Sequence, residues 1–393
     1  MGTIIKLSTN KKIEAKQMKA TDKLNIVLKH IKETFVGKNE IIDLLGIGLL
    51  ARENAFLLGP PGTAKSALIR ALSNGIEDGN NFEYLLTRFT EPNEIFGPFD
   101  IRKLKEGELI TNTEGMMPEA SMVFLDEIFN ANSAILNSLL MALNEKIFRR
   151  GKETKKLPAL MFVGASNVLP EDEALNALLD RFLIRIKCDY VEPDLLQEVL
   201  LAGWKLEGTI AKEVPTISAD EIRELQQLCR KVNLNPIRNE YVDIIHSLRN
   251  TGIKVSDRRA VKLQNLIAAS ALMCGRTEAI LSDLWVLKFI WDNEEQIEIL
   301  EGIINQIIEK DTSTEAHPQA IYNKTPDGES VMKEVNLLTE KWQDENLSFA
   351  EQNVIKDKLR YIQTRCDWIK DAEQKKYIQE HIESLWQKIL QTI

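Results

Sequence analysis

The sequence contains few of the residues that build disulfide or zinc sites. Its 393 residues include four histidines, with no H-E-x-x-H motif, and four cysteines, with no C-x-x-C pair: Cys188, Cys229, Cys274 and Cys366. Such wide spacing disfavours structural disulfides and zinc sites. The cysteines are therefore interpreted as buried free thiols.

Long apolar runs are also absent. No run approaches the roughly 18 residues that a membrane-spanning helix needs. The N-terminus, which begins Met1-Gly2-Thr3, has neither a secretory h-region nor the Ser or Thr of a myristoylation signal. We therefore expect a cytoplasmic protein without a membrane span.

Basic residues are outnumbered by acidic ones, 50 to 59, which gives a formal charge of −9. All of this excess lies in residues 283–393, which hold 22 acidic and 13 basic side chains. A wholly basic nucleic-acid-binding surface is therefore not expected, although a local basic stripe stays open. With 19 glycines, 12 prolines and 44% hydrophobic residues, the chain has the composition of compact domains.

The hydrophobic pattern predicts an α/β domain followed by helices. From Thr21 onward, short apolar runs alternate with helical patterns, which is typical of a largely parallel sheet. Strands are expected at 55–58, 84–88, 121–125, 160–163 and 182–186. The strand signal fades after Pro193, and the helical segments that follow are broken near Pro215, Pro236 and Gly252.

This pattern divides the chain into four parts. Residues 1–20 are expected to form a mobile arm, 21–190 the α/β domain, 191–280 a small all-helical domain and 281–393 a C-terminal helical bundle. Amphipathic segments at 279–308, 331–343, 349–368 and 372–393 carry five of the six tryptophans. We interpret these tryptophans as helix-packing anchors, with a partner-docking face as the alternative.

A glycine-rich loop, Gly59-Pro-Pro-Gly-Thr-Ala-Lys-Ser66, lies where the first strand turns into a helix. Backbone N–H groups at such a turn bind phosphate, Lys65 can reach the β- and γ-phosphates, and Ser66 can ligate Mg²⁺. Gly59 and Gly62 let the backbone approach the ligand. Ala64 replaces the second glycine of the strict pattern, and a turn without a ligand is the alternative.

Two adjacent carboxylates, Asp126 and Glu127, end the apolar run Met-Val-Phe-Leu. Alone they could be a solvated strand end. Because they follow Lys65 by 61 residues and several strand-like runs, we expect Asp126 to hold Mg²⁺ through water. Glu127 is then the base that activates the attacking water.

Three further polar residues follow the same logic. Asn167, at the end of the run from Leu160, suits a water-positioning amide, with a plain turn residue as the alternative. Arg181 lies between a helix and a strand, where it can reach a neighbour's γ-phosphate or pair with Asp180. Arg258 or Arg259, at a helix start, can reach back to the same phosphates or be a solvated basic helix start.

These motifs together resemble the MoxR branch of AAA+ ATPases, most closely the regulatory ATPase variant A (RavA) subgroup, over roughly 21–292. The resemblance implies a P-loop AAA+ parallel-sheet domain with a helical lid. It implies ATP and Mg²⁺ as cofactors, Walker A at Lys65 and Ser66, and Walker B at Asp126 and Glu127. It also implies sensor 1 at Asn167, and nucleotide contacts from Val36, Gly37, Gly59, Pro60, Pro61, Gly62, Thr63, Ala64, Lys65, Ser66 and Ala67.

The same resemblance assigns Arg181 as an arginine finger that acts in trans and Arg258, in preference to Arg259, as sensor 2. A trans arginine implies an oligomer, and the family forms hexameric rings. The structured insert of the family corresponds to 91–118. RavA-like proteins also carry an inserted β-rich domain that docks a lysine decarboxylase, but the matching stretch here, 311–329, is too short for a domain. We therefore do not expect that partner.

The leading hypothesis is an Mg-ATP-driven ring that remodels a protein client in assembly or cofactor maturation, with a von Willebrand factor A-domain (vWA) protein as partner by family habit. One alternative is a nucleic-acid motor or loader, which the acidic balance disfavours. The other alternative is a scaffold that binds ATP and scarcely hydrolyses it.

Overall fold

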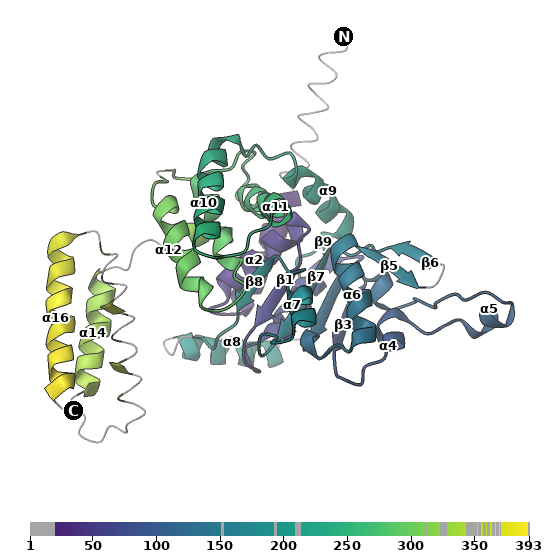
Figure 1. Ribbon diagram of the computed structural model, residues 1–393, viewed down its shortest axis with the longest axis horizontal. Coiled ribbons are helices and arrows are strands. Elements are labelled where there is room, and N and C mark those ends of the chain that lie inside the picture. The colour runs from purple at the N-terminus through teal and green to yellow at the C-terminus, as the bar shows by residue number, and fades with distance from the viewer. Residues whose placement is uncertain are drawn as a thin grey trace, which may run out of the picture. The chain divides into compact units, whose positions relative to one another are not determined.

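The computed structural model describes residues 20–150, 153–191, 195–208, 214–311, 313–322 and 328–342. Within 352–391 it describes 352, 355–356, 359, 362–363, 366, 369 and 371–391. The chain divides into two compact units, one up to His317 and one from Pro318 (Figure 1). The expected arm at 1–20, except for its last residue, and most of the expected helix at 349–368 lie outside the described residues. Within the described ranges, every helix is too short or too polar to cross a bilayer.

The first unit is built on a five-stranded parallel sheet in the order β3-β4-β7-β1-β8. Its strands are β1 (Ala55–Leu58), β3 (Asn81–Leu85), β4 (Met122–Asp126), β7 (Met161–Ser166) and β8 (Ile184–Lys187). All four residues of β1 and all six of β7 are buried, as in a parallel sheet covered on both faces. The expected α/β fold is confirmed. β1 has the expected bounds, and the other strands start within three residues of theirs.

Helices pack around this sheet because their apolar residues share a face. Ahead of β1 lie an unlabelled helix over 20–34 and α2 (Asn39–Ala51). The helices that follow in the α/β part are α3 (Lys65–Asn74), α6 (Ser133–Glu145), α7 (Glu173–Leu179) and α8 (Leu196–Gly208). Two 3₁₀ turns, η1 (Met117–Glu119) and η2 (Ile128–Asn130), flank β4.

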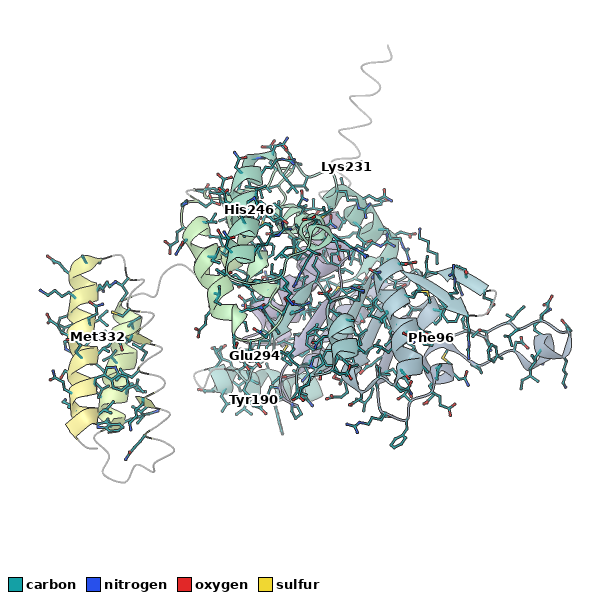
Figure 2. All side chains as sticks on the ribbon, in the orientation of Figure 1. Phe96, Tyr190, Lys231, His246, Glu294 and Met332 are labelled. Atoms are coloured by element: carbon teal, nitrogen blue, oxygen red, sulfur yellow. The ribbon has the colours of Figure 1, made fainter. Side chains whose placement is uncertain are left out.

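Two small sheets were not anticipated from the sequence. β5 (Ile147–Arg150) and β6 (Glu153–Lys156) form an antiparallel hairpin, and β2 (Ile76–Glu77) pairs with β9 (Ile217–Ser218). Most side chains of the hairpin are charged, so its sequence lacks the apolar pattern of a buried strand. Its anchor is the buried Phe148, which stacks on Phe96 with ring centroids 5.5 Å apart. Figure 2 labels Phe96 at this contact.

The expected insert at 91–118 forms two short helices, α4 (Pro92–Phe96) and α5 (Ile101–Lys105). An isolated bridge joins Phe99 to Thr111 at the base of a loop that carries α5 at its tip. This loop projects away from the body of the first unit (Figure 1). Ile101 is 70% exposed there, so the tip presents an apolar side chain to solvent.

Helices form the rest of the first unit: α9 (Ala219–Cys229), η4 (Asn235–Ile237), α10 (Arg238–Asn250), α11 (Asp257–Met273), η5 (Leu281–Phe289) and α12 (Gln296–Ile308). The segment 279–308, expected as one amphipathic pattern, is interrupted between η5 and α12. Asp292 lies in this interruption, and its carboxylate pairs with the buried Arg185 and Arg259. Trp285 and Trp291 are fully buried there, as expected of packing anchors.

Residues 281–317 thus pack within the first unit, whereas the sequence analysis starts a C-terminal bundle at 281. The second unit contains α13 (Pro318–Tyr322), α14 (Gly328–Trp342) and α16 (Ala372–Gln391). It has its own apolar core, which includes Val331, Val335, Leu338, Leu359, Ile378, Ile382 and Leu385. Met332, labelled in Figure 2, packs against this core.

Candidate functional site

The glycine-rich loop connects β1 to α3 in a tight path. A Cβ placed on Gly59 would lie 2.1 Å from the Cys188 carbonyl oxygen, so only glycine fits between β1 and β8. Gly62 and Ala64 have φ of 82° and 66°, in the left-handed region. Glycine adopts this region freely and alanine at a cost of about 1 kcal/mol, so Ala64 retains the backbone shape of the usual glycine.

Lys65 begins α3 and turns its ammonium group back into this loop. Its Nζ donates to the carbonyl oxygens of Gly59 at 2.6 Å and Pro60 at 2.9 Å, and to Asn167 Oδ1 at 3.3 Å. The residue is only 8% exposed. Thr63 closes the turn by donating its hydroxyl to the Pro60 carbonyl oxygen at 3.0 Å. The ammonium group is therefore held beside the N-terminus of α3, where anions bind.

The two carboxylates come close to Lys65 because β7 is the only strand between β4, which they end, and β1, which leads to Lys65. Ser66 Oγ donates to Asp126 Oδ2 at 3.3 Å, and Asn167 Nδ2 donates to Glu127 Oε1 at 2.6 Å. Glu127 has a positive φ of 50°, which turns its side chain off the strand axis. The structure thus brings Lys65, Ser66, Asp126, Glu127 and Asn167 together at the carboxyl edge of the sheet.

The electrostatics of this cluster suit a general base. Partial burial and the neighbouring Asp126 carboxylate raise the pKa of Glu127 above its ordinary value, while the Lys65 ammonium opposes the shift. A carboxylate with a raised pKa accepts a proton more readily than an ordinary one. The amide of Asn167 donates to Glu127 and accepts from Lys65. It therefore fixes the positions of the carboxylate and the ammonium group relative to each other.

The donor set also fits Mg²⁺. Ser66 and Asp126 offer a hydroxyl and a carboxylate, the oxygen ligands that Mg²⁺ prefers. Among the described residues, His, Cys, Asp and Glu form no group of three or more that could hold a metal. Mg²⁺ commonly binds through one or two protein oxygens together with water and substrate phosphates, which matches this sparse set.

The segment expected on the adenine side lies near the end of β8. Gly37 has a φ of 74°, and a Cβ on it would lie 3.2 Å from both Val191 and Leu195. Val36 beside it is half-buried. Tyr190, labelled in Figure 2, is 67% exposed and donates to the Pro61 carbonyl oxygen at 3.3 Å. Tyr190 was not predicted from the sequence, because it belongs to no recognisable motif. It lies near the glycine-rich loop because it follows β8, the neighbour of β1 in the sheet.

Arg181 lies at the opposite, amino edge of the sheet. Its carbonyl oxygen accepts a 3.0 Å hydrogen bond from Asn54, the residue immediately before β1. Its side chain is 31% exposed and lies 3.6 Å from Asp180. Among the described residues, no group pairs with its buried Nε. A full strand length separates Arg181 from the phosphate loop of its own chain.

The two arginines at the start of α11 have different surroundings. Arg258 donates to Asn144 at the end of α6, next to Leu143, whose carbonyl oxygen also accepts from Asn54 at 3.2 Å. Arg258 therefore shares the amino edge with Arg181 and does not reach the phosphate loop of its own chain. Arg259 is 8% exposed and donates to Asp292 at 2.9 Å, so it is an internal structural residue.

A cavity of about 430 Å³ also opens at the amino edge of the sheet. Its lining includes Arg52, Leu160, Arg223 on α9 and Arg230 directly after α9. None of the five clustered residues lines it, so the candidate site is the carboxyl-edge cluster and not this cavity.

Comparisons with known proteins agree with this architecture. Residues 22–227 match the model of the MoxR domain in the MoxR-vWA-beta-propeller ternary systems, and residues 226–304 match an AAA lid domain. A solved structure of a candidate ATPase from Cytophaga hutchinsonii superposes with a TM-score of 0.61 at 19% identity, covering 78% of this chain and 99% of that chain. At this identity the likeness speaks for the fold alone.

Relatives in sequence extend the match. An uncharacterized protein of Methanocaldococcus jannaschii is 39% identical over 290 residues, covering 73% of this chain and 75% of that protein. The chaperone MoxR1 of Mycobacterium tuberculosis is 24% identical over 220 residues, 55% of each chain. A MoxR domain model that spans more than half of the chain, followed directly by an AAA lid, shows that this protein belongs to the MoxR family of AAA+ ATPases.

Proposed function

We propose that this protein hydrolyses Mg-ATP in an oligomeric ring and uses the energy to remodel a protein client. The observation that carries the proposal is the cluster at the carboxyl edge, where Asn167 links Lys65 and Glu127 through hydrogen bonds of 3.3 and 2.6 Å. A phosphate-binding loop, a metal-binding pair and a positioned base are what hydrolysis of a phosphoanhydride requires.

Each residue of the cluster has a role in this proposal. With Mg-ATP bound, Lys65 would exchange its two carbonyl partners for the β- and γ-phosphates. Ser66 and Asp126 would hold Mg²⁺, which would supply positive charge to the phosphates. Glu127 accepts the proton of the attacking water, and Asn167 orients Glu127 and that water. Glu127→Gln keeps the shape of the side chain and removes its basicity, so we expect turnover to fall at least 100-fold with ATP affinity kept.

The amino-edge arginines support assembly. Arg181 and Arg258 are a strand length away from the ATP site of their own chain and do not reach it, which supports a role at the site of a neighbouring subunit. On the other edge, α8 exposes an apolar face in which Leu200 is 65% and Trp204 80% exposed. An exposed patch of this kind favours contact with another protein surface. We propose a hexameric ring in which Arg181 is the trans arginine finger and Arg258 sensor 2.

The partner and the subgroup are further parts of the proposal. The matching family model describes MoxR domains in systems with vWA and β-propeller components, which supports a vWA-domain partner. The proposal includes a cytoplasmic chaperone-like role in assembly or cofactor maturation. The residues of the motifs resemble those of the RavA subgroup most closely, so we propose that the protein is related to that subgroup. The stretch that would hold a decarboxylase-docking β-rich domain, 311–329, is too short for one, so that partner is not part of the proposal.

The test is ATPase rate against protein concentration, with mass measured in parallel with and without ATP. We expect the rate per subunit to rise with concentration as a ring-sized mass appears, and we expect Arg181→Ala to lower it at least 100-fold. A flat rate per subunit with a monomeric mass would refute the ring and favour a nucleotide-binding scaffold.

A further inference from the structure

Asn54 is a buried polar residue to which no role has been assigned. It lies between α2 and β1, is 2% exposed, and uses both donors and the acceptor of its side chain. Its Nδ2 donates to the carbonyl oxygens of Arg181 at 3.0 Å and Leu143 at 3.2 Å, and its Oδ1 accepts from Lys146 Nζ at 2.8 Å. Its backbone oxygen accepts from the N–H of Leu183 at 3.1 Å.

These bonds hold the turn that carries Arg181 on two sides. The side chain of Asn54 fixes the Arg181 carbonyl, and the backbone of Asn54 fixes residue 183 at the entry to β8. An arginine side chain loses rotamer entropy when it is fixed in one position. Backbone motion at Arg181 would add to this cost, so a restrained backbone should favour the position in which its guanidinium contacts another subunit. Asn54 restrains this backbone from the position directly before β1, the strand that leads into Gly59.

The same residue reaches the segment that carries the partner of Arg258. Leu143 and Lys146 flank Asn144, which accepts the hydrogen bond of Arg258. The preceding residue, Glu53, is 6% exposed and accepts from Lys262 at 3.1 Å and Asn265 at 3.3 Å, both on α11, the helix whose first turn contains Arg258. Both amino-edge arginines are therefore tied to the two residues that precede β1.

We propose that Asn54 is a positioning residue that holds Arg181 for action on the ATP of the neighbouring subunit. The inference rests on the proposed function, in which Arg181 acts in trans. Asn54 lies at the amino edge and has no contact with the loop of its own ATP site. Loss of its donors should lower turnover by about 10- to 100-fold while ATP affinity changes less than twofold.

Asn54→Asp is the sharpest variant, because it keeps the size and the acceptor for Lys146 and removes both donors. Asn25→Asp is the matched control: Asn25 also donates to a backbone carbonyl, that of Met273 at 3.0 Å, but has no link to Arg181. If Asn54→Asp fails to fold, Asn54→Ala combined with Lys146→Met removes the buried pair together.

A mixing experiment separates positioning from structural damage. Glu127→Gln subunits cannot hydrolyse ATP but carry intact arginines, so in excess they should supply well-held fingers to Asn54→Asp subunits. We expect turnover per Asn54→Asp subunit to rise toward that of wild-type subunits diluted in the same way. Arg181→Ala should be rescued likewise, and Asn25→Asp should need no rescue.

The outcomes of this experiment are distinguishable. If Arg181→Ala is rescued and Asn54→Asp is impaired but not rescued, Asn54 acts within its own subunit and the inference is overturned. If Asn54→Asp turns over at the wild-type rate, it is overturned as well. If Arg181→Ala is neither impaired nor rescued, the trans mechanism fails, and the inference that rests on it fails for that separate reason.

Discussion

At the scale of single residues, Glu127 connects the geometry of the site to a measurable pH dependence. Its pKa is raised by burial and by Asp126, and a base works only when deprotonated. We therefore predict that kcat/KM falls as the pH is lowered. The midpoint of this fall should lie above the pKa of an ordinary glutamate. The measurement is kcat/KM against pH, with folding checked at each point. An acid limb at or below the ordinary glutamate value would contradict the assignment.

Lys146 gives a second prediction at this scale. Burial lowers its pKa to about 7 from an ordinary 10.5, so between these values the unfolded chain binds more protons than the folded one. The free energy of unfolding should therefore rise with pH over this window, by up to about 1.4 kcal/mol per pH unit from this residue. In Lys146→Met that contribution should vanish. The measurement is the free energy of unfolding, from denaturant titrations, at several pH values from 7 to 10 for the wild type and Lys146→Met. The same pH dependence in both proteins would contradict the prediction.

At the scale of elements, Asp292 joins β8, α11 and the turn before α12. Its carboxylate accepts from Arg185 and, at 2.9 Å, from Arg259, and both arginines are buried. Burial lowers the pKa of Arg185 to about 10, yet it stays charged at neutral pH. Asp292→Asn removes the charge that balances two buried cations, so we predict a loss of about 3 kcal/mol in the free energy of unfolding.

Asp180→Asn is the control for this prediction. Asp180 also lies 3.7 Å from Arg185, but its side chain is 58% exposed and its charge is screened by water. Its loss should cost less than about 1 kcal/mol in the same denaturant titration. Equal costs for the two variants would mean that the buried charges are balanced elsewhere.

Elements also show where sequence patterns stop being informative. The strand expected at 84–88 occupies Asn81–Leu85, because its register is set by pairing with β4, from Asn81 opposite Met122 to Leu85 opposite Asp126. Leu86 is buried too, so hydrophobicity alone cannot tell where the ladder ends. The hairpin at 147–156 was not predicted because most of its side chains are charged, so the sequence shows no apolar strand pattern. The contact of Phe148 with Phe96, which anchors the hairpin, is visible only in the structure.

At the scale of the whole molecule, the two units have separate cores. All the candidate site residues, from Val36 to Arg258, lie in the first unit, and the second has its own apolar cluster. We predict that a chain ending at His317 folds and binds ATP with unchanged affinity, and that 318–393 alone is helical. Circular dichroism and binding of a fluorescent ATP analogue test both parts. Loss of ATP binding in the shortened chain would show that the units depend on each other.

The sequence alone was enough to predict the chemistry of the site, because the prediction rests on short contiguous patterns: a glycine-rich turn before a helix, and carboxylates after a buried strand. The parallel order of β4, β7 and β1 then brought Ser66, Asp126, Glu127 and Asn167 within hydrogen-bonding reach. Even Ala64 could be accepted in advance, since a small residue can adopt a left-handed backbone.

Only the tertiary structure decided what lies at the opposite edge of the sheet. It separated Arg258, which faces the exterior of the amino edge, from the adjacent Arg259, which is buried against Asp292. It also revealed Asn54 as the residue that holds Arg181. Such distinctions depend on which groups meet when residues 33 to 127 positions apart are packed together, and no local periodicity or composition encodes that meeting.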